Sequence, residues 1–462
     1  MKNIIYLFFL FLSTLYSSQH ILLGGGEYKF NEAKVSCLSE EQRVEIQSQL
    51  NNSIENLKKD RKISPINKIN GQPKFIWPVR KSANAPYSEV WAISNFIDHN
   101  KNYPNQLLDW NCGSRTYDTT DGYNHQGIDI YLWPFAWQQV ENNHAEVIAA
   151  ADGVIIHKTD GNYDRNCDFS NPNWNAVYIR HEDGSVAWYG HMKRNSLTNK
   201  AIGENVKAGD FLGVVGSSGN STGPHLHFEV YDSNNQLVET YQGNCNSFTN
   251  SNTSWWVQQK PYKEPRINAV MTHSSVPDLK FYNCPQLEII NISDQFSVGS
   301  DVIVSVYLAD QIANSSVNIK VTGPDGISIY NFNHPLSENY SSSYWYWKFF
   351  ASNFKSTGKW KFEATYNEVT KVHEFNYGAA LAVNDVAIDD FEVFPNPMKD
   401  ILTIKSKNNQ IIEKVNIYDT SGKMSLYAIS NFNNVDVSSL KSGIYILEII
   451  TNNGTVTKKV IK

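Results

Sequence analysis

The stretch GPHLHFEVY, residues 223–231, predicts a β-strand that starts directly after a tight Gly-Pro turn. Side chains alternate between the two faces of a strand, so His225 and His227 share one face, while Leu226 and Phe228 point to the other. The two imidazoles are about 7 Å apart at the backbone, which lets both reach one small site. Two solvated strand residues would be a simpler explanation, but the preceding turn aims both rings at a fixed point and favours a site.

Two other segments supply residues of matching chemistry. In NHQGIDIYLW, His125 and Asp129 stand four residues apart at the start of an apolar, strand-like run. One zinc ion can take an imidazole nitrogen and a carboxylate oxygen together. In VAWYGHM, His191 ends another alternating run and could face the same cleft.

The combined set contains enough groups for three metal ligands and two bases. Catalytic zinc typically keeps three protein ligands and an open position for water, whose pKa the metal lowers to about 7. A neighbouring imidazole can move protons at that pH. The pattern therefore indicates a zinc hydrolase in which one histidine of the H-x-H pair binds metal and the other handles protons.

The composition limits the class of protein. The 462 residues are 41 % hydrophobic and 19 % charged, which indicates globular folding rather than disorder. The formal net charge of -6 is modest, and there is no long run of like charge, so nothing suggests a nucleic-acid partner. The 13 % aromatic content suits β-structure, and the length predicts roughly two to four domains.

The N-terminus predicts export. Residues 1–18 contain a lysine, an apolar run over residues 4–12 and then small polar residues, which is typical of a secretory signal peptide. A transmembrane anchor is the alternative, but the run is short of the roughly 20 residues that a span needs. No other segment is apolar enough to cross a bilayer, so we expect a secreted chain with no stable membrane span.

Residues 19–74 form an extension ahead of the first β-rich region. The run SEEQRVEIQSQLNNSIENLKKD predicts one helix, with Ser39 as a possible N-cap, followed by a linker. We interpret the segment as a structural extension, with a pro-segment as the alternative. A pro-segment could supply a fourth zinc ligand in place of water. Asn31, Glu32 and Cys37 carry possible donor atoms, and the sequence favours none of them.

The rest of the chain predicts three β-rich domains. Residues 75–262 contain short strands separated by Gly, Asn and Asp turns, including a hairpin at HEDGSVAWY. Residues 265–382 contain longer alternating strands and predict an immunoglobulin-like β-sandwich. Its aromatic strand SSYWYWKFF could stack on sugars or fill the core. Residues 388–462 predict a further small β-domain.

Five cysteines are present, and an exported chain allows them to form disulfides. They are Cys37, Cys112, Cys167, Cys245 and Cys284. The odd count leaves at least one unpaired within the chain, and there is no C-x-x-C motif. Spacing does not determine the pairing; Cys112 with Cys167, and Cys245 with Cys284, are guesses.

These motifs closely resemble the lysostaphin/LytM-type zinc endopeptidases over residues 120–232. The match includes H-x-x-x-D, AADGVI, YGHM and the glycine-rich approach VKAGDFLGVVGSSGNSTGPHLHFEV. The resemblance implies a twisted antiparallel sheet with a narrow cleft, and peptidoglycan peptides as substrates, often with glycine at the scissile bond. It also implies residue roles: one Zn²⁺ held by His125, Asp129 and His227, and two catalytic histidines, His191 and His225. Which of those two is the base and which stabilises the oxyanion stays open.

The chain departs from that family in two insertions, IYLWPFAWQQVENNHAEV and DGNYDRNCDFSNPNW. We expect both to border the cleft, which leaves the glycine preference and peptidoglycan specificity open. Tyr117 or Tyr123 could correspond to an upstream tyrosine that polarises the carbonyl in some members of the family.

The C-terminal sequence resembles a second known type. FPNPMKDILTI, VNIYDTSGK, VDVSSLKSGIYILEI and KKVIK are similar to the sorting domain of the Bacteroidota type IX secretion system, over residues 390–462. The resemblance implies the type IX machinery as a partner, with export through the periplasm and outer membrane.

Together these observations predict a secreted, monomeric, mainly β zinc endopeptidase that cleaves peptidoglycan peptides or cross-bridges. An extracellular endopeptidase that acts on proteins is the first alternative. A non-catalytic wall-binding or regulatory protein is the second, although the complete set of ligands argues against it.

Overall fold

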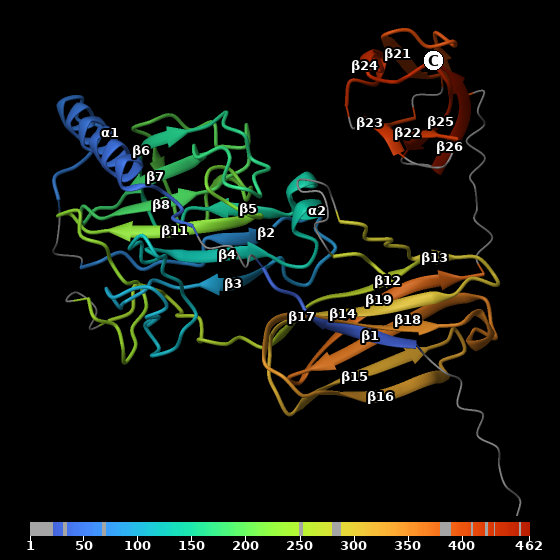
Figure 1. The fold of residues 1–462 in the computed structure, drawn as a ribbon, viewed down its shortest axis with the longest axis horizontal. Helices are drawn as coiled ribbons and strands as arrows, with labels where there is room; N and C mark the ends of the chain where they lie inside the picture. Colours follow the sequence, from blue (N-terminus) through green and yellow to red (C-terminus); the bar gives the residue numbers. More distant parts are fainter. Residues whose placement is uncertain are drawn as a thin grey trace, which may run out of the picture. The chain divides into compact units, whose positions relative to one another are not determined.

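The structure is a computed structural model. It describes residues 22–30, 35–66, 71–248, 253–279, 288–378, 390–407, 410–420, 424–428, 430–451 and 454–462. The chain divides into two compact units, Met1–Tyr377 and Gly378–Lys462 (Figure 1). The predicted signal peptide of residues 1–18 lies outside the described residues. The fold is mainly β, as the sequence predicts.

A seven-stranded antiparallel sheet carries the candidate site, in the order β3-β4-β11-β8-β7-β6-β9. Its strands are β3 (Trp91–Asn95), β4 (Ile128–Leu132), β11 (His225–Tyr231), β8 (Val186–Gly190), β7 (Ala176–Arg180), β6 (Gly153–Thr159) and β9 (Asn205–Val206). The predicted hairpin joins β7 to β8, and Gly184 turns it with a φ of +88°, which favours glycine. A smaller sheet has the order β10 (Phe211–Val214), β5 (Ala145–Ile148) and β2 (Val79–Lys81).

The reverse face of β11 anchors the site strand in the core. Leu226 and Phe228 are buried, as the alternation predicts. The Phe228 ring contacts Phe75 at 5.7 Å and Tyr189 at 5.1 Å between centroids. These apolar contacts fix which face of β11 carries the histidines, because a slip of one residue would bury them in the core instead.

Two further sheets pack face to face in the same unit and form the predicted sandwich (Figure 1). One has the order β1 (Leu22–Glu27), β17 (Tyr340–Phe349), β14 (Val302–Gln311) and β12 (Arg266–His273). The other has the order β13 (Gln295–Phe296), β19 (Val369–Tyr377), β18 (Gly358–Tyr366), β15 (Ser315–Thr322) and β16 (Ser328–Leu336). The short helix η1 (Ala351–Asn353) follows β17. Trp347 and Phe349 of the aromatic strand are buried between the sheets, so these two rings fill the core.

A buried histidine ends β12. His273 donates a hydrogen bond from Nδ1 to the Ile290 carbonyl oxygen at 2.7 Å. Its Nε2 accepts one from the Tyr307 hydroxyl at 3.1 Å. Burial, with a smaller effect of nearby His373, lowers the pKa of His273 to about 4. The ring is therefore neutral and fully hydrogen-bonded at neutral pH.

The aromatic insertion after Asp129 borders the cavity through Tyr131, as expected, but most of its remaining residues pack elsewhere. The helix α2 (Ala136–Glu141) within it is largely buried. The Trp133 indole donates a hydrogen bond to the Leu308 carbonyl oxygen of β14 at 3.0 Å, and Phe135 packs edge-on against Tyr307. These rings need apolar cover, and the first sheet of the sandwich supplies it, so one continuous core runs through both parts of the unit.

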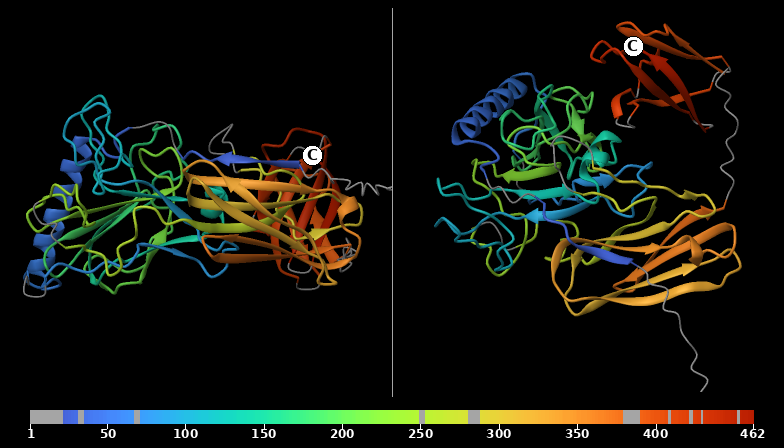
Figure 2. Two further views of the ribbon diagram at one scale, coloured as in Figure 1. Left: turned by 90° about the horizontal axis from the view of Figure 1, so that it is seen from below. Right: turned by 45° about the vertical axis from the view of Figure 1, so that its right-hand side comes forward.

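The N-terminal residues contact both parts of this unit. β1 pairs with the edge of β17 in antiparallel register, and the predicted helix forms as α1 (Glu40–Lys59). Ser39 caps α1 in a capping box with Gln42, as the sequence suggests. Figure 2 shows α1 beside the seven-stranded sheet, where Leu50 and Leu57 join an apolar cluster with Trp188.

The second unit folds around its own core. One sheet contains β20 (Phe391–Phe394), β21 (Ile401–Ser406) and β24 (Val435–Asp436). The other contains β23 (Met424–Ala428), β22 (Ile412–Asp419), β25 (Ile444–Thr451) and β26 (Gly454–Ile461). The helix η3 (Phe432–Asn434) precedes β24.

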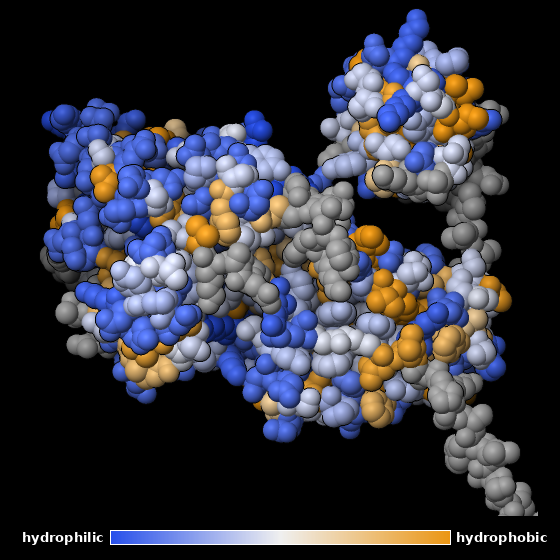
Figure 3. All heavy atoms as spheres, viewed as in Figure 1, coloured by the Kyte–Doolittle hydropathy of each residue, from blue (hydrophilic) through white to orange (hydrophobic). Residues whose placement is uncertain are grey.

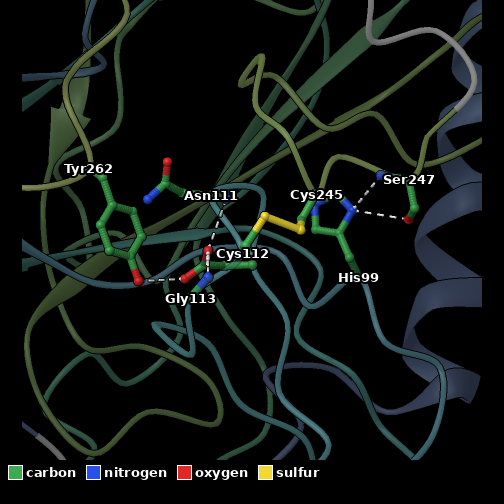
Figure 4. The surroundings of a disulfide bond; sticks show 8 residues. His99, Asn111, Cys112, Gly113, Cys245, Ser247 and Tyr262 are labelled. Carbon is green, nitrogen blue, oxygen red and sulfur yellow. Dashed lines mark hydrogen bonds between the residues drawn. A yellow bond between two sulfur atoms is a disulfide. The ribbon is translucent and has the colours of Figure 1, made fainter.

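The disulfide pairing differs from both guesses. Cys112 is bonded to Cys245, which rules out the guessed partner of each (Figure 4). Hydrogen bonds of Asp109 to the Gly113 amide and the Tyr262 hydroxyl hold the loop beside the bond. Sequence spacing could not reveal this pair, because its cysteines are 133 residues apart and the fold brings them together. Cys284 lies outside the described residues.

The visible face in Figure 3 is hydrophilic over much of α1 and its surroundings. Within the described ranges, no helix is long and apolar enough to cross a membrane.

Candidate metal and catalytic site

Strand register assembles the site around β11. His227 lies opposite Asp129 on β4 and opposite Gly190 on β8. His191 follows Gly190 directly, so neighbouring strands on both sides contribute a site residue. His225 lies two residues from His227 on the same face, and all these side chains are buried. The structure therefore brings the predicted residues of three strands to one point.

His125 completes the group from the loop before β4. Its Nε2 lies 3.0 Å from Asp129 Oδ2, and His227 Nδ1 lies 2.7 Å from Asp129 Oδ1. Gly127 lies between His125 and Asp129 in the sequence, and a Cβ on it would come within 2.6 Å of His227 Nε2. The glycine is needed because the His227 ring occupies the space of a side chain.

The other ring nitrogens of these two histidines face fixed acceptors. His125 Nδ1 donates to the Phe96 carbonyl oxygen at 2.7 Å, and His227 Nε2 donates to Glu229 Oε1 at 2.7 Å. These partners leave Nε2 of His125 and Nδ1 of His227 directed toward Asp129. Acceptors behind histidine ligands are typical of metal sites, because they fix the ring orientation and the tautomer.

His191 and His225 have a different arrangement. His191 has a φ of 59°, in the left-handed region, which turns its ring back over the site. Its Nδ1 donates to the Ser218 carbonyl oxygen, and its buried Nε2 has no hydrogen-bond partner among the described residues. His225 Nδ1 donates to the Gly223 carbonyl oxygen at 2.9 Å, and the two rings lie 4.3 Å apart. In both rings Nδ1 is held by a backbone carbonyl, which leaves Nε2 as the nitrogen directed at the site; His225 Nε2 lies 3.7 Å from Asp129 Oδ1.

Burial and the local charges set the pKa values in the site. Burial lowers the pKa of His191, and neighbouring His225 lowers it further, which keeps the ring neutral and able to accept a proton. Burial alone would raise the pKa of Asp129, but His125 and the other histidines around it hold that pKa well below its usual range. Against the same burial effect, Arg43 and His227 lower the pKa of Glu229 to about 2.

The donor atoms fit zinc. Four buried residues, Cys37, His125, Asp129 and His227, each offer one ligand atom, and these atoms all lie within 4.8 Å of one another. Nitrogen, oxygen and sulfur are the ligand types that zinc takes. His125 Nε2 is buried and faces the Asp129 carboxylate at 3.0 Å, so both groups could ligate one cation.

Two residues that the sequence left without a role contact this group. Glu229 shares the face of His227 and accepts a hydrogen bond from its Nε2. The Arg43 guanidinium donates to both Glu229 oxygens at 2.8 and 2.9 Å. Alternation along β11 places Glu229 on the face of His225 and His227 but predicts no role for it. No local signal identified Arg43, which lies 186 residues away in the sequence.

The two candidate tyrosines occupy different positions. The Tyr117 ring stacks on His125 at 4.6 Å, and its hydroxyl lies 3.2 Å from Cys37 Sγ. The Tyr123 ring contacts the Tyr117 ring at 5.9 Å between centroids, and of the two only Tyr117 lines the cavity. Tyr117 is therefore the tyrosine that lines the site.

A cavity opens in front of the group, and its walls come from several parts of the chain, including Ser341 of β17. Asp129, Tyr131 and His225 line it from the sheet. Phe169 of the second insertion lines it too, as expected for that insertion. Tyr28, Phe30 and Cys37 of the N-terminal residues form the remaining wall, together with neighbours in the sequence.

Comparison with known proteins gives matches over two parts of the chain. Residues 123–239 match Peptidase family M23, and residues 392–462 match the Secretion system C-terminal sorting domain. The first range contains all five histidine and aspartate residues of the site.

Curated relatives match the same region. The DD-carboxypeptidase/endopeptidase Mpg of Neisseria meningitidis is 45 % identical over 107 residues, 23 % of this chain and 20 % of that protein. The peptidoglycan DD-endopeptidase ShyC of Vibrio cholerae is 37 % identical over 105 residues, 23 % of this chain and 19 % of that protein. The glycyl-glycine endopeptidase ALE-1 of Staphylococcus capitis is 34 % identical over 110 residues, 24 % of this chain and 25 % of that protein.

This chain thus spans a quarter or less of the length of these relatives. The likeness is confined to the region that holds the site. The chain therefore carries a metallopeptidase domain of family M23, of the LytM and lysostaphin type, together with a C-terminal sorting domain that indicates export by type IX secretion.

Proposed function

We propose that this protein is a secreted zinc-dependent endopeptidase that hydrolyses peptide bonds in peptidoglycan peptides or cross-bridges. The observation that carries the proposal is the meeting of five buried residues, His125, Asp129, His191, His225 and His227, beside one cavity. In this proposal one Zn²⁺ is held by His125, Asp129 and His227. The chain acts as a monomer, and the type IX machinery is its partner during export.

Each of the remaining residues has a task that its contacts support. Bound zinc would polarise the scissile carbonyl and lower the pKa of a water molecule to about 7. His191 and His225 each hold their proton on Nδ1 through a backbone carbonyl, so each can accept a proton at Nε2. One removes a proton from the attacking water and passes that proton to the leaving amine. The other, protonated at Nε2 from solvent, donates a hydrogen bond to the oxyanion and keeps its proton.

Asn95 and Glu229 keep the proposed ligands in place. Asn95 donates from Nδ2 to Asp129 Oδ2 at 3.0 Å, which orients the carboxylate. Glu229 holds His227 through Nε2, so that Nδ1 points into the site. A rigid set of ligands supports catalysis because no side chain has to reorganise during the reaction.

The relatives support peptidoglycan as the substrate class. Their names describe a DD-carboxypeptidase/endopeptidase, a peptidoglycan DD-endopeptidase and a glycyl-glycine endopeptidase. The bulky aromatic insertion after Asp129 would be a reason to consider a protein substrate, but apart from Tyr131 it packs mainly against the sandwich and gives that alternative little support.

Mass analysis of peptides released from defined peptidoglycans tests the proposal. Because Tyr28, Phe30 and Cys37 line the same cavity, the assay uses the zinc-loaded full chain and the chain cut in the linker of residues 60–74. We expect new peptide ends that a chelator abolishes and that a His125→Ala/His227→Ala variant does not produce. Equal release by that variant would refute the site, and release from casein alone would refute the substrate.

A further inference from the structure

The chain's own N-terminal segment, defined here as the described residues within 22–59, lies across the candidate site. The Phe30 ring stacks on Tyr131 at 4.5 Å and lies edge-on to His225 at 5.8 Å. Cys37 lies deeper, among the proposed zinc ligands. The space in front of the metal position is therefore partly filled by this segment.

The surroundings of Cys37 are those of a ligand. Its Sγ lies 3.7 Å from Nδ1 of His227, the nitrogen that faces the proposed metal, and 3.2 Å from the Tyr117 hydroxyl. The thiol is buried, and it is free, unlike the bonded pair of Cys112 and Cys245. The close approach of one sulfur, two imidazole nitrogens and a carboxylate oxygen is the second observation that points to a metal.

A buried cysteine often serves as a small apolar side chain, and the next residue shows what that would look like. Leu38 is also buried, but it belongs to the apolar cluster beneath α1. Cys37 instead contacts a hydroxyl and an imidazole. Leu38 is therefore a core residue, whereas Cys37 is directed at the metal position.

The chain holds Cys37 in place from both sides. Before it, Asn220 donates from Nδ2 to the Ser36 carbonyl oxygen at 3.1 Å. After it, Ser39 and Gln42 form the capping box that starts α1, and Arg43 forms the buried ion pair with Glu229. These contacts fix the sulfur position without help from a metal.

The other end of the segment is fixed on the sandwich. β1 pairs with β17 from Leu22 to Glu27, over its whole length. Gly24 lies so close to Tyr346 that a Cβ would come within 2.2 Å of the tyrosine hydroxyl oxygen. A Cβ on Gly25 would come within 2.2 Å of the Tyr344 carbonyl oxygen. The glycines thus let the segment lie flat along the edge of β17.

We propose that Cys37 is the fourth ligand of the metal and that the segment it belongs to keeps the peptidase latent. This inference rests on the proposed function. Cys37 binds as a thiolate, and its proton passes to solvent. The sulfur then occupies the coordination position that a catalytic zinc site leaves open for water. Removal of the segment reopens that position.

X-ray absorption at the zinc edge of the full chain tests the ligand directly. We expect one sulfur neighbour at about 2.3 Å in addition to nitrogen and oxygen neighbours. In Cys37→Ser the sulfur neighbour disappears, and the variant retains zinc less tightly, with a dissociation constant raised about tenfold or more. A spectrum of the intact chain with nitrogen and oxygen neighbours alone would overturn the proposal, whatever the activity.

Hydrolysis of peptidoglycan tests latency separately. Cys37→Ser should release peptides at least about tenfold faster than the full chain, because more molecules carry an open coordination position. Equal rates would overturn latency and leave the proposed function standing. A sulfur neighbour in the spectrum without hydrolysis by any form of the chain would support the ligand and refute the function.

A cleavable form of the full chain guards against misfolding of the variant. A site-specific protease sequence inserted between Ile66 and Gly71 allows the segment to be cut away from the folded chain with every one of its residues unchanged. After cleavage and separation of the segment, the zinc spectrum should lose sulfur and the rate should rise. Retention of the sulfur neighbour after separation would refute Cys37 as its source.

Discussion

Arg43→Met should destabilise α1 more than the substitution of any exposed charged residue on that helix does. The Arg43 guanidinium donates to both Glu229 oxygens and also, at 2.8 Å, to the Tyr231 hydroxyl. The side chain of Arg43 is 9 % exposed and that of Glu229 is 0 % exposed. Methionine keeps much of the volume but leaves the buried carboxylate without its cation.

The size of the effect follows from that uncompensated charge. Removing one partner of a buried ion pair typically costs about 3–5 kcal/mol. Glu229 keeps donors in His227 and in the Tyr231 hydroxyl, so we take the lower limit, about 3 kcal/mol. Since 1.36 kcal/mol corresponds to a factor of ten, α1 should open about 100-fold more often.

Hydrogen exchange of peptides from α1, followed by mass spectrometry, measures this opening. Lys58→Met is the matched control: Lys58 pairs with Glu55, but their side chains are 49 % and 62 % exposed, so its effect should stay within about twofold. The double variant Arg43→Met/Glu229→Gln should regain about tenfold of the protection, because no buried charge is left alone. If Arg43→Met exchanges like the parent chain, or the double variant is as labile as the single one, the reasoning is refuted.

Three further predictions concern the stability of the fold and of the site. The stability that neutral His273 contributes is present above its unfolded pKa of about 6.5 and is lost as the pH falls toward its folded pKa of about 4. The loss amounts to at most about 3 kcal/mol. Urea unfolding of His273→Gln should therefore show a flatter pH dependence of stability between these two pH values than the parent chain. Replacing Cys112 and Cys245 by serine opens a loop of 133 residues and should cost about 4–5 kcal/mol, seen as a lower urea midpoint. Gly127→Ala should push His227 aside and weaken zinc binding about 10- to 100-fold by titration calorimetry, while circular dichroism stays unchanged.

The sequence predicted the sheet face of the site because that information is local. Alternation with period two assigns His225 and His227 to one face of β11, and the Asp183-Gly184 turn gives the neighbouring hairpin. His125 and Asp129 are close in sequence and could be recognised as a pair. The specific roles of these residues stay predictions.

What the sequence could not provide depends on contacts between distant segments. Arg43 reaches Glu229 across 186 residues, and no periodic pattern links them. The sequence did not favour Cys37 over Asn31 or Glu32 as a possible ligand. Only the fold shows that Cys37 lies beside His227. The sequence shows that Trp133 is aromatic, but β14, the strand that covers it, begins more than a hundred residues later.

The core shared by the seven-stranded sheet and the sandwich has a practical consequence for protein engineering. A fragment that stops near residue 262 would expose the rings of Trp133 and Phe135 to water, because β14 no longer covers them. Such a fragment would aggregate or denature easily. Fusing the catalytic part to another protein would require the surface around Trp133 and Phe135 to be redesigned. The sandwich therefore keeps the seven-stranded sheet soluble by covering these rings. We expect lower solubility to be the first effect of removing it.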